Sequence, residues 1–307
     1  MITTEYHIPV LLRESVSGLA IRPDGIYLDL TFGGGGHAQE IIKQISEGKL
    51  IAFDQDPAVK DQMIDDKRFS FIQHNFRFFS NYLKYMNISQ VDGILADLGV
   101  SSEHLDNPER GFSFRSDAFL DMRMSPGLKQ TAADILERAD EQELRRILDE
   151  YGELDHPHRI AHRIVLERDK QPIRTTFSLA DCLRPLFPAN RENKMLAQVF
   201  QSLRIAVNQE IQSLKEMLEQ CIIHLKPGGR LVVISYHSLE DRLVKNYIKG
   251  GNPDGIIQTD LFGNTMTPFK AINRKVIVPG LEENETNSRA RSARLRIAER
   301  TTFQPNV

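Results

Sequence analysis

The stretch "LDLTFGGGGH", residues 28–37, places four consecutive glycines directly after a short apolar run. Because glycine has no side chain, such a run usually marks a place where something approaches the backbone closely. The residues before it, "GIYLDL", predict a strand. The residues after it, "HAQEIIKQI", predict a helix with Ile41, Ile42 and Ile45 on one face. The sequence therefore predicts a strand, a bare loop and a helix in succession.

The same alternation continues along the first third of the chain. Further strands are predicted at "KLIAFD" (49–54), "RFSFIQ" (68–73) and "VDGILADLG" (91–99). Late in the chain, Pro227–Gly229 predict a turn before the buried strand "RLVVIS", and "RKVIVP" (274–279) and "RLRIAE" (294–299) predict two more strands. Strands that alternate with helices indicate βαβ units and a mostly parallel sheet, so we expect an α/β fold.

A helical block interrupts this pattern. Residues 101–128 show no sustained period, and long loops of this kind tend to be functional. In "DEQELRRILDEYG", Asp140 and Glu143 predict a capping box and Gly152 the helix end. A longer helix is predicted from Glu192, with apolar residues spaced by threes and fours at Leu196, Phe200, Leu203, Val207, Ile211, Leu214 and Leu218. We expect an all-helical domain at 106–207, inserted between two parts of the α/β domain, 1–105 and 208–307.

Composition narrows the class of protein. Hydrophobic residues make up 40% of the 307 residues, which allows a packed core. Two cysteines without a cysteine–histidine cluster argue against structural zinc and suit a reducing cytosol, so we expect a cytoplasmic protein without a metal. The N-terminus shows no signal peptide, and no apolar run approaches the roughly 20 residues that span a bilayer.

The glycine loop predicts a nucleoside cofactor. Gly33, Gly35 and Ala38 satisfy G-x-G-x-x-A, and Asp54 follows about 20 residues on, where an acid binds ribose hydroxyls. Nicotinamide dinucleotides and S-adenosylmethionine both fit this pattern. The Pro-Gly-Gly turn before a late strand favours S-adenosylmethionine. So does "DGILADLG", which places Asp97 at the carboxyl end of a strand, where open α/β sheets bind ligands.

Eight motifs together resemble one family. In chain order they are "HIPVLL", "DLTFGGGGH", "DLGVSS", "ERGFSF", "LDMRM", "FQSLRIAVN", "HSLEDR" and "RARSARLRIAER". This order is similar to that of the bacterial 16S ribosomal RNA cytosine-N4 methyltransferases, called RsmH or MraW, from His7 to Arg300. The resemblance implies a class I, Rossmann-like methyltransferase domain that uses S-adenosylmethionine.

The resemblance also implies site residues. The cofactor contacts of the family match Gly35, Gly36, His37, Asp54, Phe76, Asp97 and His104. His104 departs from the family pattern, since glutamine is frequent at its position in "SSEHLD". We expect main-chain N–H groups near the helix start to bind the methionyl carboxylate, and Asp54 the ribose. Asp97 is also the candidate catalytic residue, facing the target amine.

The implied substrate is the N4 amine of a decoding-centre cytidine in 16S rRNA of the small subunit, with the helical insertion helping to grip RNA. Two rivals remain open: a nicotinamide-dependent oxidoreductase, and an RNA-binding assembly factor with a vestigial cofactor pocket. The sequence also leaves the oligomeric state open, a homo-oligomer included.

Several polar groups have two interpretations. His158 and His162 lie four residues apart but lack the motif of known zinc helices, so a basic helix face is the preferred interpretation. The cluster in "HSLED" predicts a lining of the target-base side of the site. The tail carries the five arginines Arg289, Arg291, Arg294, Arg296 and Arg300, which predict either a phosphate-binding strip or a solvated strand edge.

Overall fold

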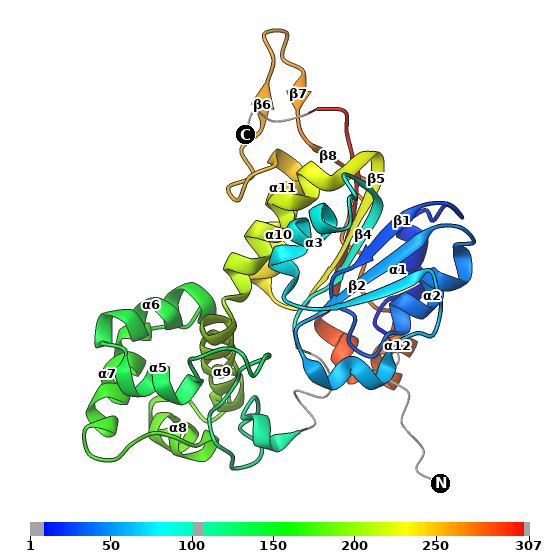
Figure 1. The fold of residues 1–307 in the computed structure, drawn as a ribbon. Helices are drawn as coiled ribbons and strands as arrows, with labels where there is room; N and C mark the ends of the chain where they lie inside the picture. Colours follow the sequence, from blue (N-terminus) through cyan, green and yellow to red (C-terminus); the bar gives the residue numbers. More distant parts are fainter. Residues whose placement is uncertain (1–8, 101–106, 304–307) are drawn as a thin grey trace. The chain divides into compact units, whose positions relative to one another are not determined.

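The computed structural model describes residues 9–100 and 107–303 (Figure 1). The chain forms two compact units, and the second is inserted into the first. The first unit combines Met1–Gly99 with Ile211–Val307, and the second is Val100–Glu210.

The first unit contains a seven-stranded sheet with the order β3-β2-β1-β4-β5-β9-β8. Neighbouring strands from β3 to β5 run parallel, whereas β9 is antiparallel to both β5 and β8. The strands are β1 (Ile26–Asp29), β2 (Lys49–Asp54), β3 (Phe69–Gln73), β4 (Val91–Asp97), β5 (Leu225–Ser235), β8 (Phe269–Ala271) and β9 (Arg294–Arg300). This mostly parallel sheet confirms the α/β prediction. The strand order reverses between β1 and β4, which is where open α/β sheets bind ligands.

Helices cover both faces of this sheet (Figure 1). Apolar residues of α3 (Phe79–Tyr85), α10 (Glu210–His224) and α11 (Ser238–Gly250) pack on one face. Those of α1 (Leu12–Gly18) and α2 (Gly36–Gln44) pack on the other. Because both faces are covered, the central strands are nearly continuous apolar runs, and β4 is buried from Val91 to Ala96.

The remaining elements of the first unit are short. They are the 3-10 helices η1 (Pro57–Gln62), η2 (Phe76–Phe78) and η5 (Ser288–Ser292), the helix α12 (Leu281–Thr286), and the hairpin of β6 (Gln258–Thr259) and β7 (Thr265–Met266). The hairpin is separate from the large sheet.

The second unit is built from helices around its own core. It contains η3 (Pro108–Arg110), α5 (Ala132–Arg138), α6 (Glu141–Gly152), α7 (Pro157–Arg168), α8 (Thr176–Leu183), η4 (Arg184–Leu186) and α9 (Glu192–Asn208). Leu144, Ile147 and Leu148 of α6 are all buried in this core.

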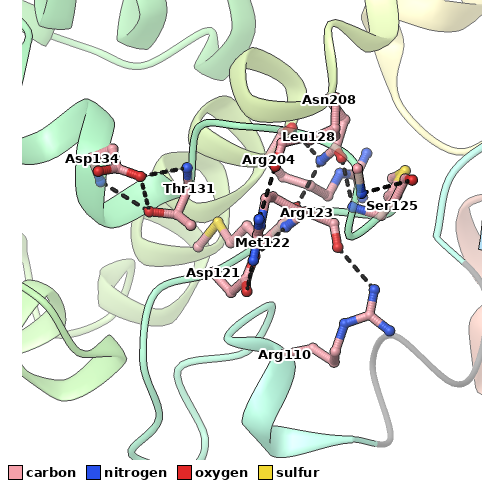
Figure 2. Close-up of polar contacts among 12 residues, drawn as sticks. Arg110, Asp121, Met122, Arg123, Ser125, Leu128, Thr131, Asp134, Arg204 and Asn208 are labelled. Atoms are coloured by element: carbon pink, nitrogen blue, oxygen red, sulfur yellow. Dashed lines mark hydrogen bonds and ion pairs between the residues drawn. The ribbon is translucent and has the colours of Figure 1, made fainter.

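The irregular segment before α5 is part of that core, because a buried asparagine anchors it (Figure 2). The Oδ1 of Asn208 accepts a hydrogen bond from Met124 N at 2.7 Å, and its Nδ2 donates to Met122 O at 2.8 Å. Beside them, the guanidinium of Arg123 binds both carboxylate oxygens of Asp121, at 2.7 and 2.9 Å. Side-chain hydrogen bonds thus replace secondary structure in this loop.

Two predicted elements are wrong. The single helix expected from Glu192 to Leu218 is two helices, α9 and α10, because Gln209 adopts a left-handed conformation with φ 51°. The strand expected at "RKVIVP" is reduced to one bridge between Ile277 and Leu295.

Two turn details also differ from expectation, and one agrees with it. Asp140 caps α6, but the Glu143 side chain binds Arg146 instead of completing a capping box. Gly152 is the last residue of α6, as predicted, and Glu153 after it takes the left-handed conformation with φ 47°. The Pro-Gly-Gly segment lies inside β5 as a bulge, since Val91 pairs with Leu225 and Gly93 with Arg230.

Candidate functional site

Three aspartates end three neighbouring parallel strands. Asp29 is the last residue of β1, Asp54 of β2 and Asp97 of β4. Since these strands are adjacent and parallel, their carboxyl ends share one edge of the sheet. The glycine loop, which joins β1 to α2, starts at the same edge.

The glycines of the loop serve different purposes. Gly35 caps α2 with φ 75°, and a Cβ there would lie 2.9 Å from the Phe32 ring. A Cβ on Gly36 would lie 2.0 Å from Pro9 Cγ. Gly33 also has a positive φ, of 50°, but the nearest atom to its Cβ position is Thr31 O at 4.0 Å. Packing and backbone conformation therefore demand glycine at 35 and 36, while the space beside Gly33 is open.

Asp54 and His37 hold the loop in place. The Oδ2 of Asp54 accepts a hydrogen bond from Gly33 N at 2.8 Å, and its Oδ1 accepts one from Asp56 N at 2.9 Å. The ring of His37 is buried, with its Nε2 3.2 Å from Val10 O. The hydrogen bond from Gly33 thereby fixes the end of β2 to the glycine loop that follows β1.

Phe76 lies at the start of η2, which follows β3, the strand that pairs with β2 and its last residue Asp54. It is half-buried and packs against the apolar cluster under α3 and α10. Asn75 caps η2, and its Nδ2 donates to Gln55 Oε1 at 2.9 Å. This hydrogen bond ties the end of β2 to the turn that carries the phenylalanine.

Asp97 is held from two sides. Its backbone N–H donates to Thr31 Oγ1 at 2.6 Å, and its Oδ1 accepts a hydrogen bond from the Tyr236 hydroxyl at 2.8 Å. The pKa of Asp97 is raised to about 7. Desolvation raises it most, the hydrogen bond from Tyr236 lowers it, and the negative charges of Asp29 and Glu240 raise it.

Asp29 lies at the same edge of the sheet, although the sequence patterns did not single it out. Its side chain is 1% exposed, and its Oδ1 accepts a hydrogen bond from Thr31 N at 3.2 Å. Its Oδ2 has no hydrogen-bond partner among the described residues. Burial raises its pKa to about 7, with a smaller contribution from the charge of Asp54. The strand-end rule that selected Asp54 and Asp97 would also have selected Asp29.

The "HSLED" motif lies at the start of α11, and its two carboxylates have different partners. Glu240 is 3% exposed and accepts a hydrogen bond from Tyr236 N at 2.9 Å. Asp241 instead binds β9, with its carboxylate 2.7 Å from Arg296 Nε and 3.2 Å from Arg294 Nη1.

The arginine-rich tail is largely structural. Besides the pairs of Arg294 and Arg296 with Asp241, Arg300 is 4% exposed and donates to Ile222 O at 2.8 Å. A phosphate-binding strip of all five arginines is therefore wrong. His104, also predicted to bind the cofactor, lies outside the described residues.

Within residues 9–100 and 107–303, every helix is too short or too polar to cross a lipid bilayer.

Comparison with known proteins identifies the family. The family model described as the MraW methylase family matches residues 4–301. A protein of Bacteroides thetaiotaomicron named ribosomal RNA small subunit methyltransferase H is 54% identical over 296 residues, covering 96% of this chain and 97% of that protein. A protein of the same name from Flavobacterium johnsoniae is 53% identical over 299 residues, covering 97% and 99%.

Among solved structures, an rRNA methylase from Streptococcus thermophilus aligns with a TM-score of 0.44 and 12% identity, covering 96% of this chain and 99% of that one. The family match and the two relatives confirm the resemblance that the eight motifs predicted. The chain belongs to the MraW methylase family, a family of S-adenosylmethionine-dependent methyltransferases.

Proposed function

We propose that this protein methylates the N4 amine of a decoding-centre cytidine in 16S rRNA, as a cytoplasmic enzyme acting on the small subunit. The names of the relatives support a small-subunit rRNA substrate. The observation that carries the chemistry is the shared edge at which Asp29, Asp54 and Asp97 meet the glycine loop.

The residues at this edge fit the cofactor. S-adenosylmethionine supplies an electrophilic methyl group on a positively charged sulfonium. A site with three carboxylates, one of them with a buried oxygen that has no hydrogen-bond partner among the described residues, suits a cationic ligand. The same charges oppose the diphosphate of a nicotinamide dinucleotide, which argues against the oxidoreductase.

The predicted cofactor residues that the structure describes each have a role in this proposal. Gly35 and Gly36 shape the start of α2, where backbone N–H groups receive the carboxylate of the methionyl part. His37 holds that turn against Val10 O. Asp54 binds the ribose hydroxyls, and Phe76 offers an apolar face to the adenosine.

Asp97 acts on the acceptor. The cytidine amine is a poor nucleophile, because its lone pair is delocalised into the ring. An ionised Asp97 accepts a hydrogen bond from that amine, which favours a tetrahedral nitrogen and offsets the positive charge that develops on it. The rest of the catalysis is positioning, which requires the target base to be unstacked from its neighbours.

The inserted unit offers a surface for the flanking RNA. A cavity of about 240 Å³ is lined by Asp155, His156, Arg159, Ile160, Leu186, Phe187, Pro188, Arg191 and Met195. Of these, Ile160, Phe187 and Met195 are buried apolar residues, whereas Arg159 and Arg191 are exposed, and Arg191 pairs with Asp155 at 3.2 Å. A cavity lined by apolar residues and cations suits an unstacked base with its phosphate.

The decisive experiment is transfer of tritiated methyl groups to small subunits purified from cells that lack the modification. We expect label in 16S rRNA, located at N4 of one decoding-centre cytidine after nuclease digestion and chromatography. Label on another base or on protein would refute the proposal. RNA binding without transfer would support the rival assembly factor with a vestigial pocket.

A further inference from the structure

Tyr236 is held at both its ends beside the candidate catalytic aspartate. It follows directly after β5, and its hydroxyl donates to Asp97 Oδ1 at 2.8 Å. Its backbone N–H donates to Glu240 Oε2 at 2.9 Å, at the start of α11. Its ring packs over Gly99, where a Cβ would lie 3.2 Å from Tyr236 Cδ2. The neighbouring backbone and α11 thus fix where the phenolic oxygen lies.

We infer that Tyr236 is a positioning residue for methyl transfer. Its hydroxyl holds the carboxylate of Asp97 in place and favours the ionised form, so that the second carboxylate oxygen of Asp97 accepts a hydrogen bond from the acceptor amine. This inference rests on the proposed function of Asp97. It adds a residue that no motif of the sequence singled out.

The electrostatics of the site assign the hydroxyl a role beyond packing, which is to oppose the rise in the pKa of Asp97. The pKa of Asp97 is raised to about 7, mainly by desolvation and further by the carboxylates of Asp29 on β1 and Glu240 on α11. The hydrogen bond from Tyr236 opposes them and favours the ionised form. Without the hydroxyl, a larger fraction of Asp97 is protonated at neutral pH and cannot accept the amine hydrogen.

The test is Tyr236→Phe, which keeps the ring and removes the hydroxyl. Single-turnover methyl transfer is measured with saturating S-adenosylmethionine across about pH 6 to 9. We expect the rate near pH 6 to fall about tenfold, the acid limb to move up by about one pH unit, and the rate to recover at high pH. An unchanged profile, or an equal loss at every pH, would show that Tyr236 only packs.

Tyr247→Phe is the matched control. The hydroxyl of Tyr247 donates to the carboxylate of Glu219 at 3.1 Å. Tyr247 is buried and lies on α11, the helix that follows Tyr236. The Tyr247→Phe variant therefore loses the same kind of hydrogen bond, from a tyrosine hydroxyl to a carboxylate, and leaves Asp97 unchanged. We expect its acid limb to match the wild type, and a shift equal to that of Tyr236→Phe would overturn the inference.

A second measurement does not depend on activity. Carboxyl ¹³C resonances of labelled aspartate are titrated in the wild type and in Tyr236→Phe, with Asp97→Asn used to assign Asp97. We expect the Asp97 midpoint to rise by about one pH unit in Tyr236→Phe, whereas an unchanged midpoint overturns the inference. If the wild type transfers no methyl group to the small subunit, the proposed function fails while this titration still decides whether Tyr236 controls Asp97.

Discussion

At the scale of single residues, the three aspartates that end β1, β2 and β4 lie in different environments. Asp54 accepts two backbone hydrogen bonds, Asp97 accepts one from a tyrosine, and Asp29 has a buried oxygen with no hydrogen-bond partner among the described residues. Strand-end position predicted that Asp54 and Asp97 lie at the ligand edge. It could not predict Tyr236, because no periodicity in "SYHS" tells which strand a tyrosine hydroxyl will reach.

Asp54→Ala should weaken S-adenosylmethionine binding about tenfold or more, because charge-assisted hydrogen bonds to the ribose are worth about 1.5–3 kcal/mol. Isothermal titration calorimetry measures this directly. The exposed Asp61, on the neighbouring η1, provides the control Asp61→Ala, which removes the same charge. Wild-type affinity in a folded Asp54→Ala protein would remove Asp54 from the cofactor site.

Asp97→Asn should slow methyl transfer about 100-fold at saturating cofactor, because it replaces a charged acceptor with a neutral amide in a water-poor site. Single-turnover kinetics separate this effect from cofactor affinity. A normal transfer rate would leave Asp97 as a binding residue only.

Asp29→Asn should change how stability depends on pH. Since the folded-state pKa of Asp29 is raised to about 7, its contribution to stability is present at low pH and is lost as pH rises through that value. Asparagine carries no charge. The free energy of unfolding of the variant, relative to that of the wild type, should therefore increase by about 1–3 kcal/mol from pH 5 to pH 8. Urea unfolding at both values measures the difference, with the exposed Asp24→Asn as control. A difference that does not change with pH would contradict the assignment.

At the scale of elements, sequence patterns located strands better than breaks. The apolar runs of β2 and β4 predicted both strands, because strands buried on both faces need such runs. The break at Gln209 left no signal, since apolar spacing continues from α9 into α10. At "RKVIVP", an apolar run was mistaken for a strand, but only Ile277 pairs with the sheet.

The packing of β9 on α11 gives a prediction at this scale. Arg296→Ala should destabilise the protein by about 1–3 kcal/mol, because it deprives the largely buried Asp241 of its closest cation. Arg291→Ala, in the same basic segment but exposed, should leave stability unchanged. Urea unfolding of both variants tests whether the segment is structural, and equal stability of the two would contradict that role.

At the scale of the whole molecule, the chain is mildly acidic, with a formal net charge of −3, yet its proposed substrate is a polyanion. Binding must therefore rely on local groups of cations, and each cation that meets a phosphate steepens the salt dependence of affinity. The tail has few arginines left for this purpose, since Arg294, Arg296 and Arg300 are bound to the protein itself. The cavity of the inserted unit offers two further exposed cations, Arg159 and Arg191, of which Arg191 also pairs with Asp155 at 3.2 Å.

Reversing the charge of both arginines, Arg159→Glu with Arg191→Glu, should weaken binding of small-subunit RNA at least tenfold and reduce the slope of log affinity against log salt by about 1.4. The slope follows because each contact with single-stranded RNA contributes about 0.7. The matched control reverses Lys129 and Arg145, two exposed cations of the same unit outside the cavity. Filter binding at several salt concentrations provides both quantities. If the control weakens binding as much and flattens the slope equally, net charge explains the affinity, and the cavity has no special role in holding the RNA.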